Sequence, residues 1–244
     1  MSEEDESQYE IDLTLLANFT HQVINPLNGV AGTLDNLVDG TIGENRREQR
    51  MKAARAQLEG VITLVRNLAY LSSAQYEAGQ PNRRIALPQV IIEAAMYYQE
   101  EGSAKRVSID LLDKRANNRV PGHPEALRQV LMNLFDNAVK YSATDSQIVV
   151  RQWIQTSTGD AVITVRNTPR NLISGAEIRK VFDLGFRGEN ARRSIASGTG
   201  LGLYICKLLM EDRLHGSISV QRDGDGILFT LKIPNGEADN GRNN

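Results

Sequence analysis

The chain contains 244 residues with a formal net charge of −2, and 41% of its residues are hydrophobic. This length allows two modest domains, each with its own core, and the near-neutral charge offers no basic field, so no nucleic-acid partner is expected. The single cysteine, Cys206, lies in an apolar helical run and excludes both a disulfide framework and a multi-cysteine zinc site, which is typical of a reducing compartment.

No apolar run approaches the roughly 20 residues that cross a bilayer. The acidic start, MSEEDESQYE, also lacks the basic and then apolar pattern of a secretory signal. The sequence therefore predicts a cytoplasmic chain that makes no membrane contact of its own.

The first third of the chain predicts a helical hairpin. Apolar residues recur at alternating spacings of three and four, as in a coiled coil or helical bundle, and the glycine-containing stretch DGTIGEN (39–45) separates two such seams. Two helices cannot bury both seams by themselves, whereas two copies close a four-helix bundle, so a homodimer is expected. The seams consist of Leu13, Leu16, Thr20, Val23, Leu27, Val30, Leu34 and Leu37, and of Met51, Ala54, Leu58, Val61, Val65 and Leu68.

Within the first helix, the stretch FTHQVINPLNG (19–29) combines a histidine with a helix breaker. Pro26 cannot donate a hydrogen bond to the carbonyl of Gln22 and crowds it, so the helix is expected to bend just below His21. Such a bend would free the imidazole on the flank of the bundle. Taken alone, however, the hairpin favours an ordinary surface histidine at His21.

The rest of the chain predicts an α+β domain, a mixed sheet with helices packed over one face. Runs of β-branched alternation indicate strands at 106–113, 147–155, 160–167, 216–223 and 226–233, and helices are expected at 89–100, 124–141 and 199–212. The predicted organisation is a disordered acidic start at 1–10, the hairpin at 11–79, a linker at 80–84, the α/β domain at 85–234 and a disordered tail at 235–244.

Two patterns in this domain indicate a phosphate-binding site. Asn133 and Asn137 lie one turn apart beside the apolar stripe of the 124–141 helix, where asparagine is unfavourable unless a metal, a phosphate or a surface position accounts for it. Gly198, Gly200 and Gly202 lead directly into the last helix, where glycines let backbone N–H groups approach a phosphate. Each pattern is weak by itself, since a surface asparagine pair and a plain flexible helix entry are the simpler alternatives.

Taken in order, the blocks NLFDNAVKYS (133–142), VFDLGFRG (181–188) and GTGLGLYICK (198–207) resemble the N, F and G2 boxes of the histidine kinase, gyrase and Hsp90 type of ATPase. The hairpin with FTHQVINPL resembles the dimerisation and phosphoacceptor domain of a sensor histidine kinase. The resemblance extends from about Leu13 to Ile233. It implies a dimeric four-helix bundle followed by an α/β sandwich that binds ATP.

The resemblance also implies roles for individual residues. Asn137, and Asn133 as a second candidate, would hold Mg²⁺, which takes few protein ligands and keeps several waters. The segment 182–197 would be a lid over the nucleotide, with Phe186 and Arg187 as its hydrophobic anchor and basic neighbour. The other implied nucleotide-binding residues are Lys140, Tyr141, Asn167, Gly198, Thr199, Gly200, Leu201 and Gly202.

The sequence departs from the family pattern in two places. The acid that normally follows the phosphoacceptor histidine is replaced by Gln22, which can orient the imidazole but cannot take its proton, while Asn25 matches the position that places a water for dephosphorylation of a partner. In the G1 box, Asn167 stands for an aspartate that reads the adenine amino group, and Pro169 and Asn171 replace glycines. Weaker or altered nucleotide affinity is therefore expected, mainly at the adenine side.

The function expected from this sequence is that of a two-component sensor histidine kinase core. It would phosphorylate itself on His21 at the expense of ATP and then transfer the phosphoryl group to the receiver domain of a response regulator, or remove it from that domain. The alternative is a phosphotransfer or adaptor protein whose ATPase-like domain has lost nucleotide binding, as the altered G1 box suggests.

Overall fold

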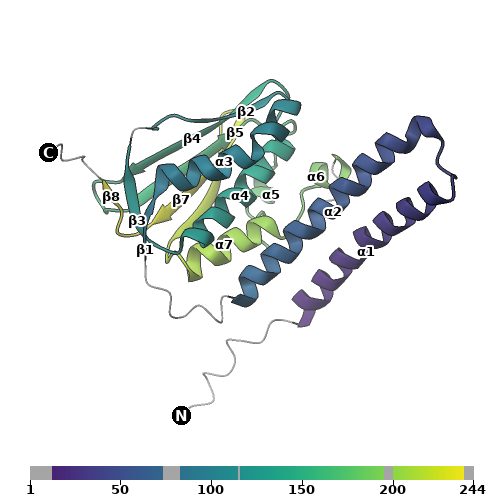
Figure 1. The fold of residues 1–244 in the computed structure, drawn as a ribbon. Helices are drawn as coiled ribbons and strands as arrows, with labels where there is room; N and C mark the ends of the chain where they lie inside the picture. Colours follow the sequence, from purple (N-terminus) through teal and green to yellow (C-terminus); the bar gives the residue numbers. More distant parts are fainter. Residues whose placement is uncertain (1–12, 74–82, 115, 195–199, 239–244) are drawn as a thin grey trace, which may run out of the picture. The chain divides into compact units, whose positions relative to one another are not determined.

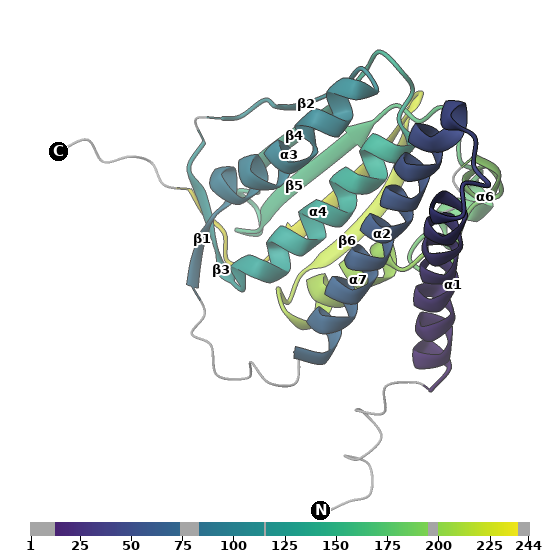
Figure 2. The same cartoon turned by 45° about the vertical axis from the view of Figure 1, so that its right-hand side comes forward.

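The computed structural model describes residues 13–73, 83–114, 116–194 and 200–238. These residues divide into two compact units, a helical hairpin and an α/β unit. Figure 1 and Figure 2 show the elements of each unit.

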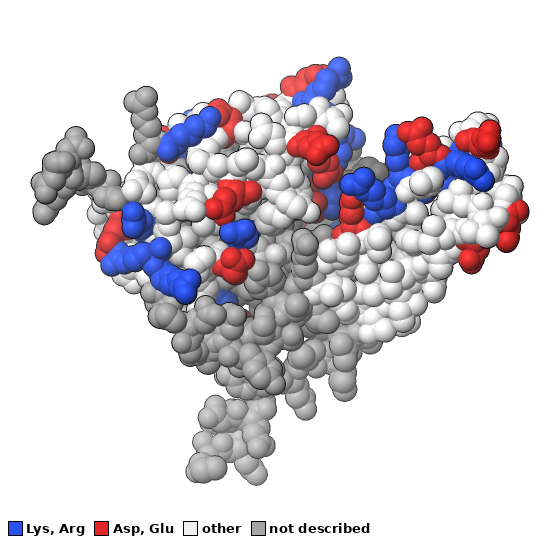
Figure 3. Space-filling view, in the orientation of Figure 1, with Lys and Arg blue, Asp and Glu red and all other residues white. Residues whose placement is uncertain are grey.

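The hairpin consists of α1 (Leu13–Val38) and α2 (Glu44–Ser73), which pack against each other. The helices approach closely at Gly29, where a Cβ atom would lie 3.0 Å from Oε1 of Gln57. Helix α1 runs without interruption through Pro26, and the bend expected there stays a prediction. Asp35 is the only Asp, Glu, Lys or Arg residue in α1, and Figure 3 accordingly shows a helix surface with very few charged side chains.

The α/β unit is built on a five-stranded sheet with the order β2-β4-β5-β7-β6, in which only β2 and β4 are parallel. Three long helices lie on one face of this sheet (Figure 2). The strands are β2 (Val107–Leu111), β4 (Ser146–Ile154), β5 (Ala161–Asn167), β6 (Ser217–Asp223) and β7 (Gly226–Ile233), and the helices are α3 (Leu87–Ala104), α4 (Pro124–Tyr141) and α7 (Gly202–Asp212). The α+β architecture expected from the sequence is thus confirmed.

Helix α4 forms the centre of the core. Pro124 occupies its first turn, where the missing N–H costs nothing, and the apolar stripe faces the sheet. Every residue of the stripe predicted from the sequence is at most 4% exposed: Leu127, Leu131, Leu134, Phe135 and Ala138. Since α4 packs against both α3 and α7, it fixes the position of both neighbours.

A second, small sheet was not predicted. It has the order β1-β3-β8, formed by β1 (Arg83–Ala86), β3 (Asn118–Gly122) and β8 (Glu237–Ala238), and an ion pair joins Arg84 to Glu237. The expected linker at 80–84 is therefore wrong for residues 83 and 84, and the expected disordered tail at 235–244 is wrong for residues 237 and 238. The expected disordered start at 1–10 lies outside the described residues.

Two short helices complete the unit, α5 (Gly175–Ile178) and α6 (Glu189–Ser194). Helix α7 begins at Gly202, three residues later than expected, because Gly200 adopts a left-handed backbone with φ of +71°. In the described parts of the chain, no helix is both long enough and apolar enough to pass through a bilayer.

Candidate functional site

The two asparagines of α4 have different environments. The side chain of Asn133 is buried, donates from Nδ2 to the carbonyl of Gly202 at 3.3 Å, and accepts at Oδ1 from Nε2 of Gln129 at 3.2 Å. Asn137 is partly exposed, and its amide has no hydrogen bond to any described residue. Asn133 therefore connects α4 to the start of α7, while the amide oxygen of Asn137 is available to a ligand.

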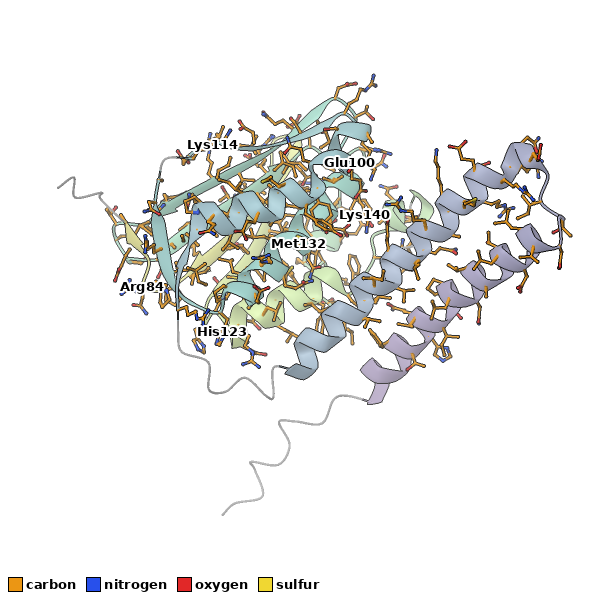
Figure 4. The ribbon with its side chains drawn as sticks, viewed as in Figure 1. Arg84, Glu100, Lys114, His123, Met132 and Lys140 are labelled. Atoms are coloured by element: carbon orange, nitrogen blue, oxygen red, sulfur yellow. The ribbon has the colours of Figure 1, made fainter. Side chains whose placement is uncertain are left out.

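One turn further along α4, Lys140 forms an ion pair with Asp136 at 2.7 Å. Figure 4 places Lys140 at the C-terminal end of α4, at the opposite end from His123. Burial raises the pKa of the Asp136 carboxyl, and the Lys140 ammonium opposes that shift. An anionic ligand that approaches Lys140 must therefore compete with a carboxylate on the same helix.

The glycine turn lies against the segment that precedes α6. A Cβ atom on Gly200 would come within 2.6 Å of the Gly185 carbonyl carbon and 2.7 Å of the Phe186 carbonyl oxygen, so only glycine fits at this position. Leu201 is buried, and α7 begins at the next residue, Gly202. The other predicted residues of this turn, Gly198 and Thr199, lie outside the described residues.

A carboxylate that precedes the predicted lid at 182–197 holds a residue within it. Oε2 of Glu177 accepts from the backbone N–H and the hydroxyl of Ser174, and Oε1 accepts from the backbone N–H of Glu189 at 2.9 Å. These hydrogen bonds, chiefly those from the Ser174 backbone and next from the Glu189 backbone, lower the pKa of the Glu177 carboxyl. Phe186 and Arg187 are partly buried, and the Arg187 guanidinium donates to the carbonyl of Ala191 at 3.0 Å.

The end of β5 meets the end of α4. The side chain of Asn167 donates from Nδ2 to Oγ of Ser142 at 3.1 Å, and both residues are buried. The neighbouring Tyr141 is partly buried, and its carbonyl accepts from the backbone N–H of Arg170 at 2.9 Å. The predicted base-side residue therefore lies beside the C-terminal end of the asparagine helix.

In the hairpin, His21 and Asn25 are exposed on α1, four residues apart and hence on one face. Gln22 is partly buried, and no donor among the described residues reaches its buried Oε1 atom. The structure gives no position of this face relative to the α/β unit, so the relation of His21 to the other predicted residues stays a prediction.

The amide oxygen of Asn137 is a donor of the kind that Mg²⁺ accepts. No group of three or more His, Cys, Asp or Glu side chains that could hold a metal occurs in the described ranges. An amide oxygen such as that of Asn137, together with ligand phosphate oxygens and water, is a sufficient set for Mg²⁺.

Sequence reasoning missed three polar residues of this site: Ser142, Asp136 and Glu177. Ser142 directly follows the predicted Lys140 and Tyr141, and Asp136 lies four residues before Lys140, a spacing that indicates an ion pair on a helix. The SGAE sequence at 174–177 is a capping-box pattern, which the structure realises at α5. These local patterns could be recognised in the sequence. The contacts of Ser142 with Asn167 and of Glu177 with Glu189 could not be predicted from it.

Known proteins with similar sequences carry an ATPase domain of the kind that the α/β unit resembles. Residues 122–237 match the family described as histidine kinase-, DNA gyrase B-, and HSP90-like ATPase. The chain is 32% identical over 231 residues to the circadian input-output histidine kinase CikA of Synechococcus elongatus, covering 90% of this chain but only 29% of CikA.

Two solved structures have the same fold. The histidine kinase AdeS of Acinetobacter baumannii superimposes with a TM-score of 0.64 at 20% identity, over 88% of this chain and 97% of that one. The histidine kinase ThkA, in complex with the response regulator protein TrrA, gives a TM-score of 0.60 at 18% identity, over 91% of this chain and 61% of that one.

The α/β unit is therefore an ATPase domain of the histidine kinase, gyrase B and HSP90 class. Together with the helical hairpin that precedes it, the chain is similar to the catalytic core of sensor histidine kinases. It spans less than a third of the length of CikA.

The carboxylate of Glu177 should control the exchange of the Glu189 amide. A lowered folded-state pKa means that these contacts are present above the usual carboxyl range and are lost as the pH falls through the folded-state value. We expect Glu177→Ala to reduce protection of the Glu189 amide by at least about tenfold at neutral pH. Hydrogen exchange followed by mass spectrometry measures this protection relative to the intrinsic rate.

The matched control is Glu211→Ala, since Glu211 is exposed on α7. The wild-type protein should lose the same protection only under acidic conditions. Unchanged protection in Glu177→Ala at neutral pH would show that the carboxylate does not anchor the lid.

Proposed function

We propose that this chain is an ATP-dependent protein-histidine kinase that phosphorylates itself on His21 and passes the phosphoryl group to a response regulator. The observation that carries the proposal is that one chain combines an exposed histidine on a hairpin helix with the asparagine helix and glycine turn of an ATPase fold. It is further supported by the kinases that the chain resembles.

The phosphate side of the nucleotide site is assigned to α4 and the glycine turn. Asn137 would hold Mg²⁺ through its amide oxygen, and Lys140 would bind phosphate oxygens after release from Asp136. Magnesium would neutralise charge on the phosphates when bound, and the chain itself contributes mainly positioning. Asn133 remains a second candidate for Mg²⁺, but its amide already connects α4 to Gly202.

The base side is assigned to Asn167. Tyr141 is assigned, with Lys140, to the phosphate side, and Phe186 and Arg187 belong to the lid over the nucleotide. The amide of Asn167 replaces a carboxylate, and its hydrogen bond to a base lacks the strength that a charge gives. We therefore expect ATP to bind, but more weakly than to a domain with aspartate at this position.

His21 is assigned as the phosphoacceptor. Its neighbour Gln22 can hold the imidazole by a hydrogen bond but cannot accept a proton from it, so autophosphorylation should be slow. Asn25, on the same exposed face, would position the water that hydrolyses the phosphoryl group on the partner. The partner assigned here is the receiver domain of a response regulator, because ThkA was solved in complex with the response regulator protein TrrA. We assign a cytoplasmic location on the basis of that partner.

We assign a homodimer to the hairpin. Several large apolar side chains on it are at least 39% exposed within one chain, namely Ile24, Leu27, Leu34 and Val38 on α1 and Met51, Leu58, Ile62 and Val65 on α2. Leu27 and Leu34 are seven residues apart, as are Leu58 and Val65, which is the repeat of a bundle seam. Pairing two hairpins in a four-helix bundle would bury these side chains.

The adaptor alternative is not favoured. Its only support is the altered G1 box, whereas a bound magnesium ion would explain the amide of Asn137, which has no hydrogen bond to any described residue.

Asn137→Ala should remove magnesium-dependent nucleotide binding, because it deletes the only free amide oxygen that α4 offers among its described residues. We expect affinity for ATP measured by calorimetry with Mg²⁺ to fall by at least about tenfold, with no change in the free energy of unfolding. Asn133→Ala is the matched comparison and should lower the free energy of unfolding by about 1 kcal/mol. An Asn137→Ala protein that binds ATP as well as wild type contradicts the magnesium assignment.

Gln22→Glu should accelerate autophosphorylation, because it supplies a base beside the imidazole. We expect incorporation of label from γ-labelled ATP to rise by at least about tenfold. His21→Gln, alone and combined with Gln22→Glu, is the control and should incorporate no label. Equal labelling of wild type and His21→Gln would sink the kinase proposal.

Leu34→Glu should dissociate the dimer, because a carboxylate would replace an apolar seam residue that is 53% exposed in the single chain. Light scattering coupled to gel filtration should report a dimer for wild type and a monomer for the variant. Asn28→Glu, which adds the same charge at an exposed polar position of α1, should leave the dimer intact. A monomeric wild type would contradict the bundle.

A further inference from the structure

The hydrogen bond between Asn167 and Ser142 lies where β5 ends and α4 ends. Nδ2 of Asn167 lies 3.1 Å from Oγ of Ser142; Ser142 is fully buried and Asn167 is 4% exposed. No donor from the described part of the chain reaches Oδ1 of Asn167. The amide therefore has one end committed to Ser142 and one end free for a ligand.

The backbone holds this pair in a fixed position. The N–H of Ala143 donates to the carbonyl of Thr168 at 2.8 Å, and the N–H of Arg170 donates to the carbonyl of Tyr141 at 2.9 Å. The Arg170 guanidinium also donates from Nε to the carbonyl of Ser142 at 2.9 Å. These hydrogen bonds hold residues 141–143 against residues 168–170. The atoms that Asn167 and Ser142 offer to a ligand can therefore change by rotation of the two side chains.

The side chains of Asn167 and Ser142 can each donate and accept a hydrogen bond. A carboxamide has a donor end and an acceptor end, and a hydroxyl both donates and accepts. In the orientation of the structure, Ser142 accepts from Nδ2 and the free end is the acceptor Oδ1. After a half-turn of the amide, Ser142 would donate to Oδ1 and the free end would be the donor Nδ2. A carboxylate at the same position has no donor end, so it can only accept.

We propose that Asn167 and Ser142 form a reversible base reader that admits both 6-aminopurine and 6-oxopurine nucleotides. This inference rests on the proposed function, which assigns Asn167 to the base. The Oδ1 atom would accept from a 6-amino group, and after reversal Nδ2 would donate to a 6-oxo group. Aspartate at position 167 would meet a 6-oxo group with two facing acceptors, which is a repulsive contact that confers selectivity.

Competitive binding of ATP and ITP in the presence of Mg²⁺ tests this inference, since inosine has a 6-oxo group and a protonated N1 where adenosine has a 6-amino group and an unprotonated N1, and it lacks the 2-amino group of guanosine. We expect wild type to bind ITP within about tenfold of ATP. Asn167→Asp should widen this ratio by at least about tenfold, since it strengthens the contact with a 6-amino group and opposes a 6-oxo group.

The control is Gln221→Glu, which adds the same charge at an exposed position of β6 and should leave the ratio unchanged. Circular dichroism establishes that each variant folds, and if Asn167→Asp does not fold, the wild-type ratio decides. A wild type that binds ATP but prefers it to ITP more than about a hundredfold, or a ratio that Asn167→Asp leaves unchanged, overturns the base reader while the kinase proposal stands. Binding of neither nucleotide overturns both.

Discussion

The packing of helix α4 is the constraint on which the rest of the α/β unit depends. Its apolar stripe is buried against the sheet, and its polar edge carries Asn137 and Lys140, the side chains assigned to magnesium and phosphate. The amide of Asn133 extends this control to the next element, because it fixes the first residue of α7 to the middle of α4. A helix is a rigid rod at this scale, so the spacing of Asn133, Asn137 and Lys140 sets the spacing of the site.

Much of this unit could be predicted from the sequence because its signals are periodic. The bounds of α4 and β7 agree with the prediction to the residue, since β-branched alternation and an amphipathic stripe are local patterns. The strands β1, β3 and β8 were missed because they are short, and because β3 contains Pro121, a residue that argues against a strand. Their pairing joins segments far apart in the chain, which no local pattern encodes.

The site was predictable in its residue types but not in its contacts. Asn137 and Asn133 look alike in sequence, yet the fold leaves one amide free and uses the other as a cross-link. Likewise, Lys140 reads as a phosphate ligand, and only the structure reveals that Asp136 competes for it. Within the α/β unit, the departures from the family pattern lie at the proposed base side, at Asn167 and Pro169, whereas the residues that we assign to phosphate match the pattern. The two ends of the nucleotide site are thus built from different elements and can change independently.

The carboxylate of Glu177 has a consequence for the conformational entropy of helix α6. It accepts from the amide of Glu189, the first residue of α6, and so attaches α6 to α5 before any ligand arrives. A segment attached in advance has fewer conformations to lose than a free one, so the ordering cost subtracted from the binding free energy is reduced.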